Sequence, residues 1–442
     1  MKDEILSLYS AHITEQKQKV LDIISISGFD ALIIYSGTPL RYYTDDQDAP
    51  FRAYAHFAHW TPLNEPGNFL LIHPNIKPLL IRVKPDDFWH EQTSLKNNFW
   101  LSEFDFREVS NADSAWQELL NMEPMRSNIQ RIAYIGDNPE WTKKRGIVED
   151  CINPSELIAS LDKNRSFKTE YEIACISKAN EIAAKGHAVA KQMFLTGASE
   201  LAIHQVYMYG VGCTEKELPY ETIVALNEKG STLHYQGKRT EIRGGKSLLL
   251  DAGANYLGYA SDVTRTFVAP DADPLFAKLL AGVETLQREL CVLAKPGLSF
   301  VDLQKEAHKK IGDLLSSLRI LNVSGEEAVS LGLTKAFFPH GVGHMLGLQV
   351  HDVGGVKKYS QQTVETENLR TNTMMEVGHV FTIEPGVYFI EMLLRSHRDG
   401  DTAKHFNWEL IDRLAPYGGV RIEDDVLVIE TGIRNLTREY LD

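Results

Sequence analysis

The chain has 442 residues, of which 43% are hydrophobic and 24% charged, and this is typical of a soluble globular protein with two domains. Its formal net charge of −14 argues against a nucleic-acid partner, because no excess of basic residues is available to neutralise phosphates. No stretch reaches the ~20 consecutive apolar residues of a membrane span, and the acidic N-terminus does not resemble a signal peptide. We therefore expect no membrane association.

The four cysteines are scattered along the chain, without the paired spacing of a zinc-thiolate or iron–sulfur site. Free cysteines of this kind are usually buried in a core. Their distribution favours a reducing compartment, and we expect a cytoplasmic protein. They are Cys151, Cys175, Cys213 and Cys291.

The first third of the chain alternates helical and strand-like patterns, beginning with a helix over residues 3–28. The strand candidates are almost continuously apolar, which indicates an α/β sheet covered on both faces. No G-x-G-x-x-G motif follows any of them, so a nucleotide site has no support. We assign residues 1–162 to this domain, with strands at 31–37, 68–74, 78–83 and 131–137.

The second domain, residues 163–442, combines helices with strands that lie between and after them. Thr169 and Glu172 have capping-box spacing, which predicts a long helix that ends near Leu195. Further helices are predicted to begin near Ser199, after Asp273–Pro274, and at Ser299. Strands are predicted within 220–227, 247–256, 259–268, 379–390 and 418–430, so this domain is α+β.

Two acidic residues occur in apolar strands on either side of a glycine-containing turn at 255–258. If this hairpin is symmetric about residues 256 and 257, Asp251 and Asp262 are directly opposite each other. Like charges in that arrangement are destabilising unless they share a proton or bind a metal ion. The alternative is an asymmetric turn in which one of the two aspartates caps a loop.

Two glutamates have a similar setting: Glu384 follows an apolar strand directly before Pro385, and Glu423 lies in another strand. A charged residue in a buried strand is rarely left without a partner. Taken alone, each would more often be a surface or salt-bridged residue than a functional one.

Three histidines, His340, His344 and His351, occur within 12 residues of a glycine-rich stretch. The i,i+4 spacing of the first two suits a helix, but the glycines argue against one, and the zincin pattern H-E-x-x-H is absent. One imidazole and four carboxylates would balance two divalent cations in charge. Oxygen-rich ligation without a thiolate favours hard or borderline ions such as Mn²⁺.

The motifs resemble those of the pita-bread metallopeptidases, a family that includes methionine aminopeptidase, aminopeptidase P, creatinase and prolidase. They occur in the family's order: DAGANYLGYASDVTRTF, PHGVGHMLGLQVHDVG, TIEPGVYF and GGVRIEDDV. Two further stretches, PYETIVALNEKGSTLHY and FIEMLLRSHRDGDTAKHFNWELIDRLAPYGG, are most similar to the bacterial prolidases, or Xaa-Pro dipeptidases. The resemblance covers essentially the whole chain and implies a creatinase-like N-terminal domain followed by a pita-bread catalytic domain.

The resemblance implies a set of metal ligands that bind two ions. Asp262 and Glu423 would bridge the ions, Asp251 would bind one, and His344 and Glu384 the other. The other histidines would then support catalysis or face the substrate; they are His340, His351 and, in STLHY, His234.

Arg421, two residues before Glu423, would share its face of the strand, hold charge near the site and contribute to substrate binding. Arg370 is a candidate for binding the carboxylate of a dipeptide, although an ordinary exposed loop arginine is the alternative. The stretch 355–369 before it looks shorter and less proline-rich than in prolidases, which leaves its placement open. Tyr220 and Asp45 are further candidates for lining the pocket, the latter across a homodimer that the resemblance leads us to expect.

The implied reaction is hydrolysis of Xaa-Pro dipeptides by a hydroxide bound between two metal ions. Glu384 would act as general base and then acid, and His351, with His234, would stabilise the oxyanion. Hydrolysis of organophosphorus triesters is an expected side activity, because a tetrahedral phosphorus centre resembles the tetrahedral intermediate. The alternatives are an Xaa-Pro aminopeptidase acting on longer peptides and a non-catalytic binding protein on the same fold.

Overall fold

The structure is a computed structural model that describes residues 2–89, 91, 93–241, 243–354 and 368–442. Its contacts divide the chain into two units. The N-terminal unit comprises Met1–Arg165 and Thr169–Ala174, and the C-terminal unit comprises Ser166–Lys168 and Cys175–Asp442. The domain boundary after residue 162 stays a prediction. No helix among the described residues is long and apolar enough to span a membrane.

The N-terminal unit is built on one mixed five-stranded sheet with the order β4-β3-β2-β1-β5. β1 pairs antiparallel with β2 and parallel with β5, while β3 pairs antiparallel with β2 and parallel with β4. The strands are β1 (Ala31–Tyr35), β2 (Phe69–Ile72), β3 (Leu79–Val83), β4 (Asp105–Val109) and β5 (Ile132–Ile135). The helices are α1 (Lys2–Ile26), α2 (Ala55–Ala58), α3 (Ala112–Leu120), α4 (Glu123–Asn128), α5 (Pro139–Lys143) and α6 (Ser155–Ser166).

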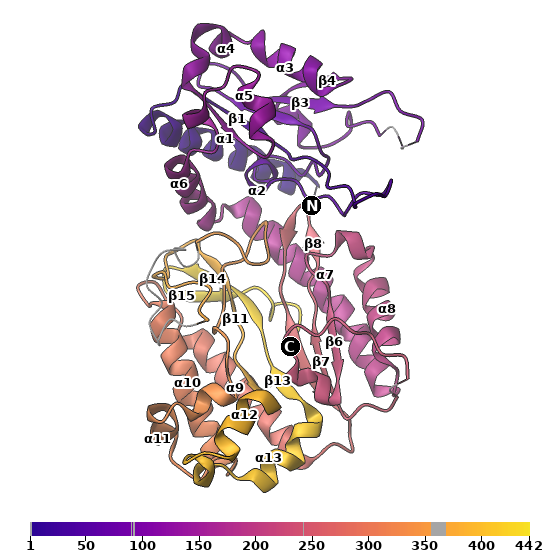
Figure 1. The fold of residues 1–442 in the computed structure, drawn as a ribbon, viewed down its shortest axis with the longest axis vertical. Helices are drawn as coiled ribbons and strands as arrows, with labels where there is room; N and C mark the ends of the chain where they lie inside the picture. The colour runs from indigo at the N-terminus through magenta and orange to yellow at the C-terminus, as the bar shows by residue number, and fades with distance from the viewer. Residues whose placement is uncertain (1, 90, 92, 242, 355–367) are drawn as a thin grey trace. The chain divides into compact units, whose positions relative to one another are not determined.

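Both faces of this sheet are buried, as the continuous apolar strands predicted. One face packs against Trp116 and Leu119 of α3 and Trp141 of α5, and the long helix α1 lies on the other side of the sheet (Figure 1). β4 was not predicted, because its sequence, DFREV, is polar and its residues are exposed or half-buried at the sheet edge.

The helices from α7 onward, most of whose residues belong to the C-terminal unit, begin where capping residues predicted. Thr169 and Glu172 form the expected reciprocal hydrogen bonds at the start of α7, and Ser199, Asp273 and Ser299 are N-caps. The helices are α7 (Glu170–Leu195), α8 (Glu200–Val211), α9 (Pro274–Leu293), α10 (Phe300–Ser317), α11 (Gly325–Ser330), α12 (Glu391–Arg398) and α13 (Trp408–Leu414).

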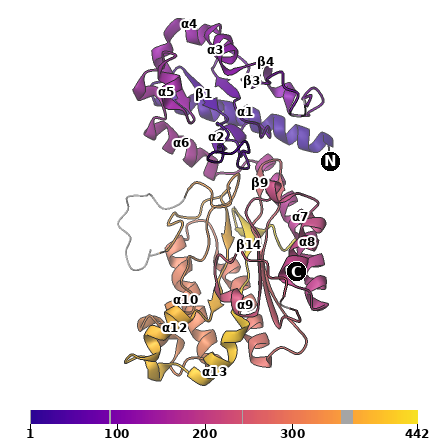
Figure 2. The ribbon, with the colours of Figure 1, turned by 45° about the vertical axis from the view of Figure 1, so that its right-hand side comes forward.

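The strands of this unit form small antiparallel sheets with the orders β10-β7-β6, β11-β14-β15, β12-β13 and β8-β9. α7 and α8 lie on one side of the strands and α9 and α10 on the other (Figures 1 and 2). The strands are β6 (Ile223–Leu226), β7 (Ser247–Asp251), β8 (Asn255–Tyr256), β9 (Tyr259–Ala260), β10 (Thr264–Val268), β11 (Val380–Ile383), β12 (Gly386–Tyr388), β13 (Gly419–Arg421), β14 (Asp424–Ile429) and β15 (Gly432–Asn435). The α/β and α+β classes of the two units are therefore as predicted.

The register of the β7–β10 hairpin differs from the prediction. Its tip consists of Leu257 and Gly258, both with positive φ (52° and 93°), so the hairpin is symmetric between these two residues. Asp251 is consequently opposite Thr264 and not opposite Asp262. The two aspartates face the same cavity, offset by two residues along the hairpin.

Candidate metal centre and active site

The glycine-rich histidine stretch runs beside β11 as an irregular extended segment, as its glycines predicted, and not as a helix. The backbone N–H groups of Leu346, Thr382 and Glu384 donate to the carbonyls of Val380, His344 and Val342, respectively. A Cβ on Gly343 would lie 1.9 Å from the carbonyl oxygen of Thr382, so this close approach requires glycine. The pairing brings the His344 imidazole close to the Glu384 carboxylate.

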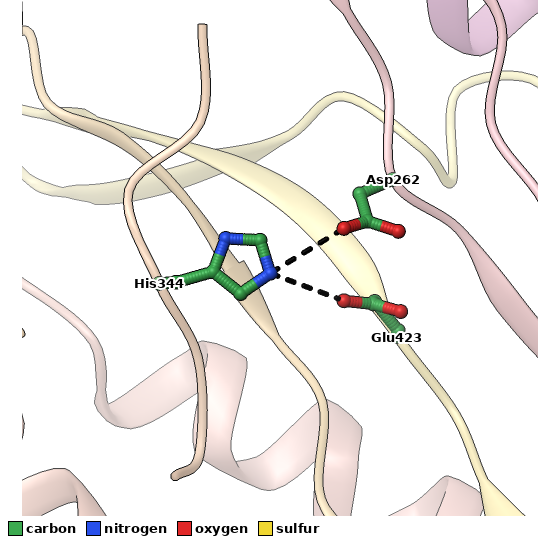
Figure 3. Close-up of side chains that lie close together, drawn as sticks. All are labelled: Asp262, His344 and Glu423. Carbon is green, nitrogen blue, oxygen red and sulfur yellow. Dashed lines mark ion pairs between the residues drawn. The ribbon is translucent and has the colours of Figure 1, made fainter. Parts of the chain in front are cut away.

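Asp262, His344 and Glu423 form a buried cluster whose potential ligand atoms all lie within 4.8 Å of one another (Figure 3). His344 Nε2 is 3.4 Å from Asp262 Oδ2, 3.9 Å from Glu423 Oε1, and 3.7 Å from Glu384 Oε1. The other ring nitrogen, Nδ1, donates to the carbonyl of Met345 at 3.1 Å. In the neutral ring this leaves Nε2 unprotonated and directed at the carboxylates, which is the tautomer of a metal ligand.

Thr264 links the two strands that supply this cluster. It forms a β-bridge with Glu423, and its hydroxyl donates to Glu423 Oε2 at 2.6 Å. Arg421 Nε donates to the same hydroxyl at 3.1 Å. Thr264 thereby positions the glutamate carboxylate from β10.

A hydrogen-bonded chain connects Asp251 to His340. Arg421 donates through Nη2 to Asp251 Oδ2 at 2.6 Å and through Nη1 to the Tyr388 hydroxyl at 2.9 Å. That hydroxyl is 2.8 Å from His340 Nε2, and His340 Nδ1 is 2.9 Å from the carbonyl of Gly341. The carbonyl can only accept, so His340 Nδ1 carries a proton and the Tyr388 hydroxyl donates to Nε2.

The protonation equilibria of the cluster reflect an excess of buried negative charge. Burial raises the pKa of Glu423 well above its ordinary value, and the carboxylates of Asp262 and Glu384 raise it further. Burial likewise raises the pKa of Glu384 to about 7, although the charges of His344 and Arg421 oppose the shift. Burial lowers the pKa of His344, but its contact with Asp262 and the charge of Glu384 outweigh burial and raise that pKa to about 9. The raised pKa values of His344, Glu384 and Glu423 mean that protons compensate the buried negative charge of the metal-free site. Metal cations would compensate the same charge in their place.

The predicted residues meet in one cavity of about 480 Å³. All five predicted metal ligands line it, as do His234, His340, His351, Arg370 and Arg421. The His351 ring packs edge-on against His344 at 4.4 Å, and Arg370 and His234 are exposed at the wall. Part of the stretch before Arg370, residues 355–367, lies outside the described residues.

Two predicted residues are placed elsewhere. Tyr220 is not among the residues that line the cavity, but its buried hydroxyl interacts with the carboxylates of Asp251 and Asp262. Burial raises its pKa, and the charges of Asp251 and Asp262 raise it further, so the phenol lies near the carboxylate cluster. Asp45 is exposed in the N-terminal unit, where its carboxylate accepts from the backbone of Asp46 and Gln47.

Comparison with known proteins identifies the family. Residues 174–430 match the model of "Metallopeptidase family M24", and residues 7–162 match that of "Xaa-Pro dipeptidase, N-terminal domain".

The chain belongs to metallopeptidase family M24.

Similar proteins include two Xaa-Pro dipeptidases. That of Shewanella halifaxensis is 38% identical over 445 residues and covers 99% of each chain, and that of Aeromonas hydrophila is 38% identical over 441 residues and covers 98% of each. Two solved structures, proline aminopeptidase P II from Yersinia pestis and a zinc-substituted Escherichia coli aminopeptidase P in complex with product, superpose with TM-scores of 0.75 and 0.72. They are 23% identical and cover 98% of this chain and 97% and 96% of their own. They support the predicted creatinase-like and pita-bread domains as a fold.

Several residues of this M24 site were not found from the sequence. Tyr388 lies in an apolar strand and gave no signal, whereas Thr264 shares the strand alternation of Asp262 and could have been inferred. Gln304 of α10 is a third: its amide accepts from the Val342 N–H at 2.6 Å and donates to the His340 carbonyl at 3.1 Å. It thereby holds the backbone between His340 and Val342, and Glu384 donates to the Val342 carbonyl.

Proposed function

We propose that this protein hydrolyses dipeptides with a C-terminal proline. The observation that carries the proposal is the cavity in which the buried Asp262–His344–Glu423 cluster lies beside two further carboxylates, Asp251 and Glu384. The whole-chain similarity to proteins named Xaa-Pro dipeptidase supports the choice of substrate.

We propose that Asp251, Asp262, His344, Glu384 and Glu423 hold two divalent cations, with Mn²⁺ favoured over softer ions. The donors fit such ions, because they are four carboxylates and one correctly oriented imidazole nitrogen. Asp251 Oδ1 is also buried without a hydrogen-bond partner among the described residues, as expected of a ligand atom. When bound, divalent cations would lower the pKa of a water molecule and polarise the substrate carbonyl.

The charge balance of the site includes the guanidinium of Arg421 as well as the five proposed metal ligands. The four carboxylates carry four negative charges, and Arg421 offsets one through its ion pair with Asp251. Two dications would therefore leave one positive charge in excess. This supports a cavity that accepts one additional anionic group, such as hydroxide or a substrate carboxylate.

Within the proposed reaction, Glu384 accepts a proton from the attacking water and passes it to the proline nitrogen as the peptide bond breaks. His351 and His234 line the cavity and would donate to the carbonyl oxygen as negative charge develops there. None of these steps needs the N–H that proline lacks.

Arg370 would position the substrate, because its exposed guanidinium on the cavity wall can bind the dipeptide carboxylate. Arg421 was predicted to bind substrate, but all three of its guanidinium nitrogens donate to protein acceptors: Thr264, Tyr388 and Asp251. We therefore assign to Arg421 the positioning of Asp251 and Tyr388.

The second candidate function is an Xaa-Pro aminopeptidase that acts on longer peptides, since the solved aminopeptidase P structures share this fold. At 23% identity that likeness concerns the fold alone. A non-catalytic binding protein is disfavoured, because all five predicted ligand positions keep ligating side chains. A homodimer with Asp45 near the partner's site, a cytoplasmic location and triester hydrolysis remain further proposals of this kind.

The test is metal analysis of the purified protein together with an assay of Ala-Pro beside Ala-Pro-Ala after loading with Mn²⁺, Zn²⁺ or Co²⁺. We expect two ions per chain and hydrolysis of the dipeptide in preference to the tripeptide. Preference for the tripeptide would establish the aminopeptidase instead. Absence of any metal-dependent cleavage would rule out both, and turnover of paraoxon in the same assay separately tests the side activity.

A further inference from the structure

Glu200, the first residue of α8, has a side chain that is wholly buried, which is unusual for a glutamate at the start of a helix. Acidic residues are common at this position because they interact favourably with the helix dipole, and that role needs no burial. Here the carboxylate lies inside the protein, against the segment Leu226–Arg239, which begins at the last residue of β6.

Within the described part of the chain the carboxylate accepts five hydrogen bonds, and every donor belongs to this one segment. Oε1 accepts from the Leu226 N–H at 3.0 Å and from Arg239 Nε and Nη2 at 3.0 and 2.7 Å. Oε2 accepts from the Tyr235 hydroxyl at 2.8 Å and the Arg239 N–H at 2.7 Å. Burial alone would raise the pKa of Glu200, but these donors and the guanidinium lower it, so the group is ionised.

These bonds join both ends of the segment and a point near its middle. Leu226 begins it, Arg239 ends it, and Arg239 Nη2 also donates to the Leu226 carbonyl at 2.8 Å. Leu233 and His234 line the active-site cavity, and Tyr235, which bonds to Glu200, directly follows His234. The His234 side chain itself is exposed, so its position depends on how firmly the backbone around it is held.

We propose that Glu200 is a positioning residue that fixes the segment Leu226–Arg239 and thereby holds His234 and Leu233 in the cavity for substrate binding. The inference rests on the proposed function, since it assumes that His234 meets the substrate. It does not involve the metal ligands, because Glu200 bonds to no residue of the Asp262–His344–Glu423 cluster. Loss of Glu200 should therefore weaken substrate binding and leave metal content unchanged.

The decisive variant is Glu200→Gln, which keeps the shape but turns one acceptor oxygen into a donor that faces other donors. The matched control is Glu215→Gln, which removes the exposed carboxylate bonded to His204, another residue of α8, at 3.0 Å. We expect KM for Ala-Pro to rise about tenfold in Glu200→Gln, with kcat and bound metal close to wild type, and to stay unchanged in the control.

A double-mutant cycle with His234→Ala separates positioning from general destabilisation. If Glu200 acts through the segment that carries His234, Glu200→Gln should change KM less than about twofold in the His234→Ala background. An equal factor in both backgrounds, or a lower melting temperature with unchanged KM, would overturn the proposal.

Hydrogen exchange provides a readout that does not depend on activity. In metal-loaded protein, Glu200→Gln should speed amide exchange across 226–239 while 247–268 stays as protected as in the control. Unchanged protection of 226–239 would contradict the positioning role. If the wild type proves inactive on Xaa-Pro substrates while this exchange difference is present, the proposed function fails and the positioning of the segment stands.

Discussion

Glu423 and Asp424 are adjacent, buried carboxylates with opposite electrostatic surroundings. Asp424 is paired with two arginines, Arg265 and Arg438, and also accepts from Gln287 and Asn435, all between 2.7 and 2.9 Å. Glu423 lies among other carboxylates, and the only neutral donor to its carboxylate that we find in the described residues is Thr264.

The pKa values differ accordingly. The pKa of Asp424 is lowered: burial alone would raise it, but Arg265 and Arg438 outweigh burial, whereas burial and neighbouring carboxylates raise the pKa of Glu423. Asp424 thus has cationic and amide donors for its carboxylate, whereas Glu423, one residue earlier, lies in a cluster of carboxylates that lacks compensating positive charge. The difference distinguishes a structural ion pair from a site that is completed by a ligand.

Removing a charge from the unsatisfied cluster should have the largest effect on activity. We expect Glu423→Gln, and equally Asp262→Asn, to lower kcat/KM on Ala-Pro by at least about a thousandfold. In EDTA the melting temperature of Glu423→Gln should equal or exceed that of wild type, because burial and the neighbouring carboxylates disfavour a charge at this position. Asp262→Asn loses the favourable contact with His344, which outweighs burial and lowers the Asp262 pKa, so it should melt below wild type. Near-normal turnover of Ala-Pro by either variant would contradict the assignment of that residue as a metal ligand.

Removing a charge from the satisfied network should instead reduce stability. Asp424→Asn leaves Arg265 and Arg438 without their common anion, so we expect the free energy of unfolding in urea to fall by about 3–5 kcal/mol. The exposed pair Arg398–Asp412 supplies the control, since Asp412→Asn should cost less than about 1 kcal/mol. Equal losses in the two variants would mean that the buried network has no special role.

The raised pKa of Glu384 predicts a pH dependence for the metal-free protein. A carboxyl whose pKa rises from 4.5 to about 7 on folding destabilises the folded state increasingly as pH increases between these values. Metal-free Glu384→Gln should therefore gain stability over metal-free wild type from pH 5 to 7, by up to about 3 kcal/mol, and level off above. Thermal melts in EDTA measure this, and a pH-independent difference would contradict the shift.

The smallest expected effect concerns the single neutral donor. Thr264→Val keeps the shape but removes the hydrogen bond to Glu423, so we expect metal affinity to fall about tenfold. Isothermal titration with Mn²⁺ measures the change, and Thr285→Val on the exposed face of α9 should leave affinity unaltered. A wild-type affinity in Thr264→Val would show that β10 does not need this contact to orient Glu423.

Local signals in the sequence predicted much of this molecule. Capping residues located the starts of α7, α8, α9 and α10, and the acids in apolar strands indicated the cavity. The register of the β7–β10 hairpin was predicted wrongly, because it depends on which two residues adopt positive φ, and Leu257 does so against its usual preference.

Contacts between residues that are distant in the sequence could not be predicted from local sequence patterns either. Arg421 pairs with Asp251, 170 positions away, and Gln304 holds the backbone of Val342, 38 positions away. Glu200 looked like an ordinary acid at a helix start, because burial of its carboxylate depends on the later path of the segment after β6. Such contacts follow from the tertiary arrangement of the strands.

The chain from Asp251 through Arg421 and Tyr388 to His340 joins two walls of the cavity. The Arg421 guanidinium donates to both the Asp251 carboxylate and the Tyr388 hydroxyl. A ligand that draws Asp251 away therefore changes the charge beside the hydroxyl that donates to His340. Thermodynamic linkage then requires the reverse effect by the same factor: a substrate group that binds His340 alters the affinity at Asp251.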